Sequence, residues 1–363
     1  MTHLRRAPLI LAFLLLAGCA EAGPPPVVDH RIPGSAPRVA DPAAAPVAEP
    51  TPSQDPAAGS EPSDADALPP GIVGSLEAAD LDESSGLVAS RLHPGLFWSL
   101  NDSGGDPELF AIGRDGSDKG RVQVRFAIAN DWEDLAIDPQ GAVWIHDGGN
   151  NKNRRRDLTV YRVPEPEALQ GVVDADRAVR FVFPDQDAFP SPGNVNFDSE
   201  ALFWDGDRLL LLTKHRSDTH TKLYRFPAGI QTDPTWDPVA LLAPGKKPPG
   251  VVLELLGAFD LGGDPDNFGG KVTAADLSPD GRRLAVLTYH ALFVFERPEG
   301  TPNWLAGPHR RIDFEQLVTM QCEAISWDGG ALLFTNEQRA VMRITNPLDP
   351  ACVRFPSQGC RTR

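Results

Sequence analysis

Acidic residues recur at one position of a repeated strand pattern, and they are the residues of this sequence best suited to chemistry. Glu133, Glu200 and Glu323 each begin a short apolar stretch that ends in an Asp-containing turn. If these stretches are equivalent strands around one axis, the carboxylates raise one another's pKa unless a cation neutralises them. Carboxylate oxygens are the ligands that a hard cation such as Ca²⁺ takes. The alternative is that these glutamates accept hydrogen bonds from neighbouring backbones and only hold the strands in register.

Basic and amide side chains occur in loops expected beside these glutamates. Asn150 and Arg155 follow one strand pair, Lys214 follows the next, and Asp102 follows the first. In an acidic protein, cations beside an acidic opening predict an anionic ligand held jointly by a metal and a guanidinium group. The alternative is a solvated loop that binds nothing. We expect Asp102, Asn150, Arg155 and Lys214 to bind the ligand.

The elements that must position these residues are short strands in a repeated order. Apolar stretches bounded by Asp, Asn, Gly and Pro recur from Gly71 onward without a long helical period, which is an all-β pattern. Equivalent first strands begin at residues 85, 133, 200, 275 and 323. Multi-stranded repeats of about 40–50 residues are typical of a β-propeller. We therefore predict an all-β fold, a β-propeller of five blades, with six as the alternative if the segment 227–270 is a blade and not an insertion.

The ring is expected to close through its N-terminal strand. No fourth strand is evident after Ile344, and residues 71–78 can supply it. The other fourth strands are expected at 121–128, 179–183, 251–256 and 310–314. The first strand of each blade lines the channel, and the loops entering it share one face with the loops between second and third strands. The acidic and basic residues therefore converge on one mouth.

The first residues have the pattern of a bacterial lipoprotein signal. Arg5 and Arg6 precede the apolar run Leu9–Leu16, which is shorter than the ~20 residues of a membrane-spanning helix. The run ends in Leu-Ala-Gly-Cys, which resembles a lipobox with Cys19 as the acylated residue. We expect residues 1–18 to be a signal peptide. The segment 19–69 is rich in Pro and Ala and should be a disordered tether. Residues 70–363 then form the propeller, held on the lipid bilayer, and Ala20 favours the outer membrane, facing the periplasm or the cell surface.

Three cysteines remain after Cys19. Cys352 and Cys360 are separated by a short loop and are the preferred disulfide in an oxidising compartment. Cys322 lies in an apolar strand pattern and is expected to be a buried free thiol. Pairing of Cys322 with either of the others is the alternative.

The composition limits the classes of molecule that this protein is expected to bind. The chain has 34 Lys and Arg against 50 Asp and Glu, a net charge of −16, which disfavours nucleic acid as a partner. The sequence contains no Gly-X-Ser-X-Gly, His-Glu-X-X-His or Cys-X-X-Cys motif. We expect a monomer.

Three motifs resemble a family of secreted bacterial propellers. They are AsnAspTrpGluAspLeuAla (130–136), HisAspGlyGlyAsnAsn (146–151) and AspSerGluAlaLeu (198–202). The resemblance spans about residues 75 to 345 and is to the group labelled esterase-like activity of phytase, and more loosely to calcium-dependent propeller phytases. It implies Asp131, Glu133, Asp147 and Glu200 as metal or ligand residues, to which the repeat adds Glu323.

Two functions follow as predictions, and a third is a variant of the second. The first is a lipid-tethered binding protein that holds a divalent metal, foremost Ca²⁺, and presents the mouth to a small anionic ligand or a protein. The second is a metal-dependent phosphoesterase or esterase-like hydrolase, in which the metal activates water and one of Arg154 to Arg156, or Lys214, stabilises charge. The third is a lactonase-like enzyme that also uses channel carboxylates and a divalent ion.

Overall fold

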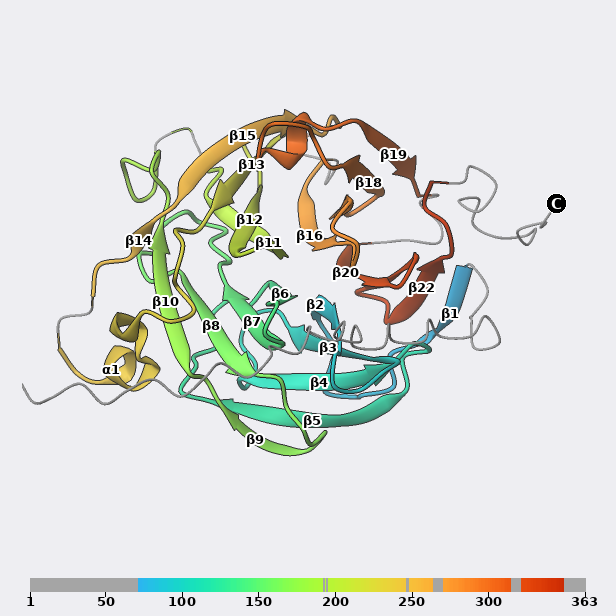
Figure 1. Ribbon diagram of the computed structural model, residues 1–363, viewed down its shortest axis with the longest axis horizontal. Helices are drawn as coiled ribbons and strands as arrows, with labels where there is room; N and C mark the ends of the chain where they lie inside the picture. Colours follow the sequence, from blue (N-terminus) through green and yellow to red (C-terminus); the bar gives the residue numbers. More distant parts are fainter. Residues whose placement is uncertain are drawn as a thin grey trace, which may run out of the picture. The chain divides into compact units, whose positions relative to one another are not determined.

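Five β-sheets are arranged around a central axis (Figure 1). The computed structural model describes residues 71–191, 193, 195–245, 248–263, 270–314 and 321–348. The predicted all-β propeller of five blades is confirmed within these ranges. The expected signal peptide, Cys19, the tether and the Cys352–Cys360 disulfide lie outside the described residues.

Each blade is built outward from an inner strand. The inner strands contact one another in the order β2, β6, β11, β16, β20 and back to β2, which closes the ring. Their bounds are β2 Ser84–Ala89, β6 Asp134–Ile137, β11 Asp198–Asp205, β16 Val272–Leu277 and β20 Cys322–Asp328. The second strands are β3 Leu96–Asn101, β7 Ala142–Asp147, β12 Arg208–Lys214, β17 Arg283–Thr288 and β21 Ala331–Asn336. The third strands are β4 Glu108–Gly113, β8 Thr159–Pro164, β13 His220–Arg225, β18 Ala291–Glu296 and β22 Ala340–Ile344.

The outer strands confirm the expected closure. The fourth strands of the first four blades are β5 Asp118–Arg125, β10 Arg177–Val182, β15 Glu254–Asp260 and β19 His309–Asp313. In the last blade this place is taken by β1 Gly71–Ser75, which pairs antiparallel with β22. The two ends of the described chain thus share one sheet, and the ring is held by hydrogen bonds between them.

Two short parallel strands correct the predicted outer edges. β9 Gly171–Asp174 pairs with β5 of the preceding blade, and β14 Val251–Val252 pairs with β10. The predicted strand 251–256 is therefore wrong as one element, because its first residues extend the second blade and its last belong to β15. The rest of the described insertion holds a 3-10 turn, Pro234–Trp236, and the short helix α1 Pro238–Leu242, with no sixth blade. Among the described residues, no helix is long and apolar enough to cross a membrane.

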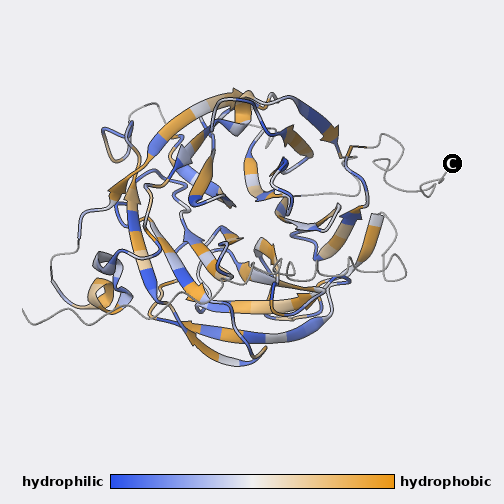
Figure 2. Ribbon diagram, viewed as in Figure 1, coloured by the Kyte–Doolittle hydropathy of each residue, from blue (hydrophilic) through white to orange (hydrophobic). Residues whose placement is uncertain are grey.

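Apolar side chains fill the spaces between neighbouring blades. Figure 2 shows hydrophobic residues along the strands of every blade. Trp144 of the second blade and Trp204 of the third meet edge to face, with ring centroids 5.5 Å apart. Such contacts between buried aromatic rings supply much of the packing energy between sheets.

Buried carboxylates also join the blades. Asp134 of β6 accepts the N–H groups of Leu135, Leu202 in β11 and Ala275 in β16, at 2.8, 2.8 and 3.3 Å. Asp276 of β16 accepts the N–H of Trp327 in β20 at 2.8 Å. The register role considered for the repeated glutamates is therefore performed by these aspartates.

A bulge near the start of the inner strands β2, β11, β16 and β20 turns one residue out of the ladder. The register shifts between Ser199 and Ala201 in β11 and between Cys322 and Ala324 in β20, so Glu200 and Glu323 are extra residues. β2 has the same shift around residue 85. In β16 the shift falls at Thr273, so the predicted equivalent, Ala275, was two residues late. A bulge re-aims the extra side chain, which accounts for the similar placement of Glu200 and Glu323, whereas Glu133 precedes β6, a strand without a register shift.

Candidate functional site

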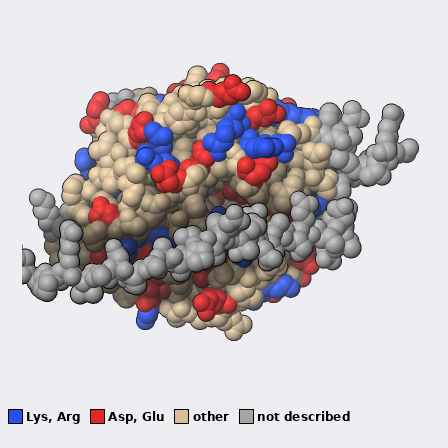
Figure 3. Space-filling model, viewed as in Figure 1, with Lys and Arg blue, Asp and Glu red and all other residues tan. Residues whose placement is uncertain are grey.

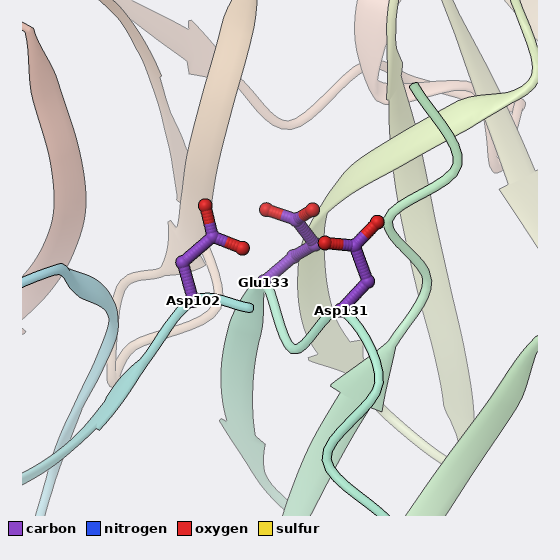
Figure 4. Close-up of side chains that lie close together, drawn as sticks. All are labelled: Asp102, Asp131 and Glu133. Atoms are coloured by element: carbon purple, nitrogen blue, oxygen red, sulfur yellow. The ribbon is translucent and has the colours of Figure 1, made fainter. Parts of the chain in front are cut away.

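Three carboxylates from two blades meet at the mouth of the channel. Asp102 follows β3 in the first blade, whereas Asp131 and Glu133 lead into β6 of the second (Figure 4). An isolated bridge between Ser103 and Asp131 holds the two loops together. One oxygen from each of the three carboxylates lies within 4.8 Å of the other two. We name Asp102, Asp131 and Glu133 the first triad.

The first triad is crowded and lacks a counter-charge in contact. Burial, and then the charge of Asp131, raises the pKa of Asp102 to about 7. Burial raises the pKa of Asp131 as well, and burial together with Glu200 raises that of Glu133 well above its usual value. Asp102 Oδ1 is buried without a hydrogen-bond partner. Among the described residues, no Lys or Arg forms an ion pair with these three carboxylates.

A second triad adjoins the first and shares Glu133. Oxygens of Glu133, Asp198 and Glu200 also lie within 4.8 Å of one another. Here the protein supplies cations: Lys214 Nζ lies 2.7 Å from Glu200 Oε2, and Arg216 Nη2 lies 2.6 Å from Asp198 Oδ2. Burial still raises the pKa of Glu200 to about 8, although Lys214 lowers it. The two triads thus differ in charge balance.

Asp147 lies behind the first triad, where it is paired with Arg155. Arg155 Nη2 is 2.9 Å from Asp147 Oδ1, and the same oxygen accepts the N–H of Asp131 at 3.1 Å. Burial raises the pKa of Asp147 to about 7 against the effect of Arg155. Arg155 also donates to the carbonyl of Gly149 at 2.8 Å. The pair therefore braces the backbone at Asp131 and at Gly149.

Glu323 and Asn150 belong to neither triad, although the backbone N–H of Asn150 donates to Asp198 Oδ1 at 2.6 Å. Burial raises the pKa of Glu323 to about 8, while Lys214 and a hydrogen bond with Tyr289 lower it. Asn150 is buried, its Oδ1 accepts the N–H groups of Arg154 and Arg155, and its Nδ2 donates to Phe197. Asn150 organises its loop, and its side-chain polar atoms are engaged within the protein.

Three residues that the structure places here are not among the metal and ligand residues predicted from the sequence. Asp198 is the third carboxylate of the second triad, Arg216 pairs with it, and Gly149 lies against the first triad. The signal for Asp198 is present in the sequence, because Asp131-Trp-Glu133 and Asp198-Ser-Glu200 share the same spacing. Gly149 lies within the motif HisAspGlyGlyAsnAsn and Arg216 follows Lys214 by two residues, but neither feature indicates contact with a triad.

Two further features are the charged side chains on one face of the molecule and the thiol of Cys322. On the face seen in Figure 3, acidic and basic side chains are intermixed and not segregated. Cys322 is buried as a free thiol, as expected, and burial raises its pKa. Neither feature adds a second site.

Comparisons with known proteins give a likeness of fold. No protein-family profile and no curated protein match the chain. Among solved structures, it is similar to the PQQ-bound form of aldose sugar dehydrogenase from Streptomyces coelicolor. The identity is 12%, the match covers 75% of this chain and 95% of the other, and the TM-score is 0.41. The resemblance to phytase-like propellers stays a prediction.

Proposed function

We propose that this propeller binds one divalent cation, foremost Ca²⁺, at the first triad, and that it is a lipid-tethered binding protein. The observation that carries the proposal is the convergence of Asp102, Asp131 and Glu133 without a protein cation against them. The carboxyl groups of the mouth outnumber Lys214, Arg155 and Arg216. A cation offsets the repulsion that otherwise forces protons onto these groups.

The residues present fit such an ion. Ca²⁺ takes six to eight oxygen ligands at about 2.3–2.6 Å, and carboxylates supply them singly or in pairs. Asp102 Oδ1 is a buried acceptor without a partner, which suits a ligand atom. Because Gly149 has no side chain, the carboxylates of Glu133 and Asp131 can lie directly against its backbone. Three protein carboxylates leave coordination positions for a ligand or partner that offers oxygen atoms.

The contacts favour binding over hydrolysis. A phosphoesterase needs cations free to meet the charge that develops on the substrate. Arg155 is engaged by Asp147 and Lys214 by Glu200, so two of the cations predicted for that role already have partners. A small anionic ligand would therefore be held mainly by the metal.

Calorimetric titration with Ca²⁺ tests the proposal. We expect one bound ion for the native chain and at least a tenfold weaker affinity for Asp131→Asn, because a neutral amide replaces an ionic ligand. Asp174→Asn is the control, since Asp174 is an exposed partner of Arg125 on β9. If Ca²⁺ and EDTA leave both binding heat and melting temperature unchanged, the proposal fails.

The same preparations distinguish the enzyme alternative. We expect no turnover of phosphomonoesters, simple esters or lactones in the presence of Ca²⁺. Hydrolysis that is lost in both Glu133→Gln and Glu200→Gln would instead identify the chain as a hydrolase.

We also propose that acyl chains on Cys19 hold the protein on the outer membrane. The support is the charged, apolar and small-residue pattern of residues 1–20. Several acyl chains, at ~0.8 kcal/mol for each buried methylene, give durable attachment. Cys19→Ala is expected to move the protein from the membrane fraction to the soluble fraction, and its retention on membranes would refute the anchor.

A further inference from the structure

The two triads at the mouth share a carboxylate but differ in what balances their charge. Glu133 belongs to both. The first triad has no protein cation in contact, whereas Lys214 and Arg216 contact the second. The buried ammonium group of Lys214 contacts one member of the second triad, Glu200, and so engages a carboxylate that a metal ion would otherwise use.

We propose that Lys214 is a built-in counter-cation of Glu200 that keeps the second triad from taking a metal ion and so limits the mouth to one divalent ion. The proposal rests on the proposed function, because it concerns how many ions the same mouth takes. Lys214 is thus a specificity-determining residue: it sets the stoichiometry and keeps a second ion away from the first.

The register between β11 and β12 places the ammonium group of Lys214 beside Glu200. Lys214, the last residue of β12, pairs directly with Asp198 on β11. The bulge that follows Asp198 turns Glu200 out of the ladder, and Lys214 Nζ reaches Glu200 Oε2 at 2.7 Å. The ammonium also lies 5.0 Å from the centre of the Tyr289 ring, whose face favours a cation. Lys214 is buried, so these contacts leave it little freedom to move away.

Repulsion between the Lys214 ammonium and a metal ion disfavours a second ion in the mouth. Like charges a few ångströms apart repel strongly where water is excluded. A second divalent ion among Glu133, Asp198 and Glu200 would therefore have to displace the ammonium from Glu200. Arg216 does not take over this role, because its Nη2 is 2.6 Å from Asp198 but 3.9 Å from Glu200. Without Lys214, Glu200 loses its close counter-charge and becomes available as a metal ligand.

Counting bound ions tests the proposal. The probe is Ca²⁺ in calorimetric titration and Mn²⁺ in electron paramagnetic resonance, both on the full chain. We expect one ion for the native chain and two for Lys214→Gln, with magnetic coupling between two Mn²⁺ ions because they share Glu133. Lys222→Gln is the matched control, since Lys222 pairs with Asp185 elsewhere in the same blade, and it should bind one ion.

A second variant separates loss of charge from loss of folding. Glu200→Gln combined with Lys214→Gln removes both the ammonium and the ligand it would release, so this double variant should return to one ion. If Lys214→Gln folds poorly alone, it is purified in Ca²⁺, desalted by gel filtration, and its metal content measured. The expected result is still two ions per chain.

The outcomes keep the two proposals distinct. If the native chain binds one ion and Lys214→Gln also binds one, the role given to Lys214 is wrong and the metal site stands. If the native chain binds none, the proposed function itself fails.

Discussion

The backbone of Gly149 runs directly against the carboxylate of Glu133. A Cβ atom at position 149 would lie 2.1 Å from Glu133 Oε1 and 2.4 Å from Asp131 Cγ. These separations are shorter than van der Waals contact allows, so any side chain at 149 must displace one or both carboxylates. Gly149 therefore makes space for two members of the first triad.

Gly149→Ala is expected to weaken Ca²⁺ binding by at least tenfold. The added methyl group shifts Glu133 and Asp131 away from Asp102, and ligand distances have a tolerance of only about 0.2 Å. Calorimetric titration measures the change, which at tenfold corresponds to about 1.4 kcal/mol of binding free energy.

Gly330→Ala is the control for this change, because a Cβ at 330 meets no atom within 4 Å and Gly330 lies in the β20–β21 turn. It should leave the affinity for Ca²⁺ as it is in the native chain. Equal affinities for Gly149→Ala and Gly330→Ala would show that the ion does not use Glu133 and Asp131.

Without a divalent ion, the protein is expected to be more stable at pH 5.5 than at pH 8. Burial raises the pKa of Asp102 and Asp276 to about 7 and that of Glu200 and Glu323 to about 8. The folded chain then binds more protons than the unfolded chain between the ordinary carboxyl pKa and these values. Its free energy of unfolding therefore falls as pH rises through this window. Melting temperatures in EDTA across the range measure the slope.

Added Ca²⁺ should reverse part of this slope, because protons and the ion compete for the first triad. We expect the ion to raise the melting temperature more at pH 8 than at pH 5.5. The full gain is about 2.7 kcal/mol at a hundredfold excess over Kd. Sodium chloride at matched ionic strength controls for screening, and a gain independent of pH would contradict binding at these carboxylates.

The ring could be predicted from sequence because strand, turn and strand recur with clear boundaries. The bulge in β16 could not, since Thr273 and the small residues after it carry no acidic marker such as Glu200. Likewise, the sequence places Lys214 and Glu200 at the same mouth but does not say that they face each other. That contact depends on the register of β12 with β11, which only pairing in three dimensions decides.

The sequence also could not show which buried carboxylates join neighbouring blades and which belong to the triads. Asp134 and Glu133 are neighbours in the chain, yet one holds blades together and the other lies in both triads. Alternation along a strand sends adjacent side chains to opposite sides. Asp134 finds backbone N–H donors because β11 and β16 lie on its side of β6, and the positions of those strands are decided only in the folded chain.

Asp134→Asn is expected to lower the free energy of unfolding by at least about 2 kcal/mol, because a buried N–H group left without an acceptor costs about 1–3 kcal/mol. The carboxylate accepts N–H groups from three strands, whereas an amide has one acceptor oxygen and an NH₂ group that faces the remaining donors. Urea unfolding measures the difference. Asp313→Asn is the control, since its ion pair with Arg311 is exposed and such pairs contribute about 0–1 kcal/mol. If both variants unfold with the same free energy, the side chain of Asp134 does not hold the second, third and fourth blades together.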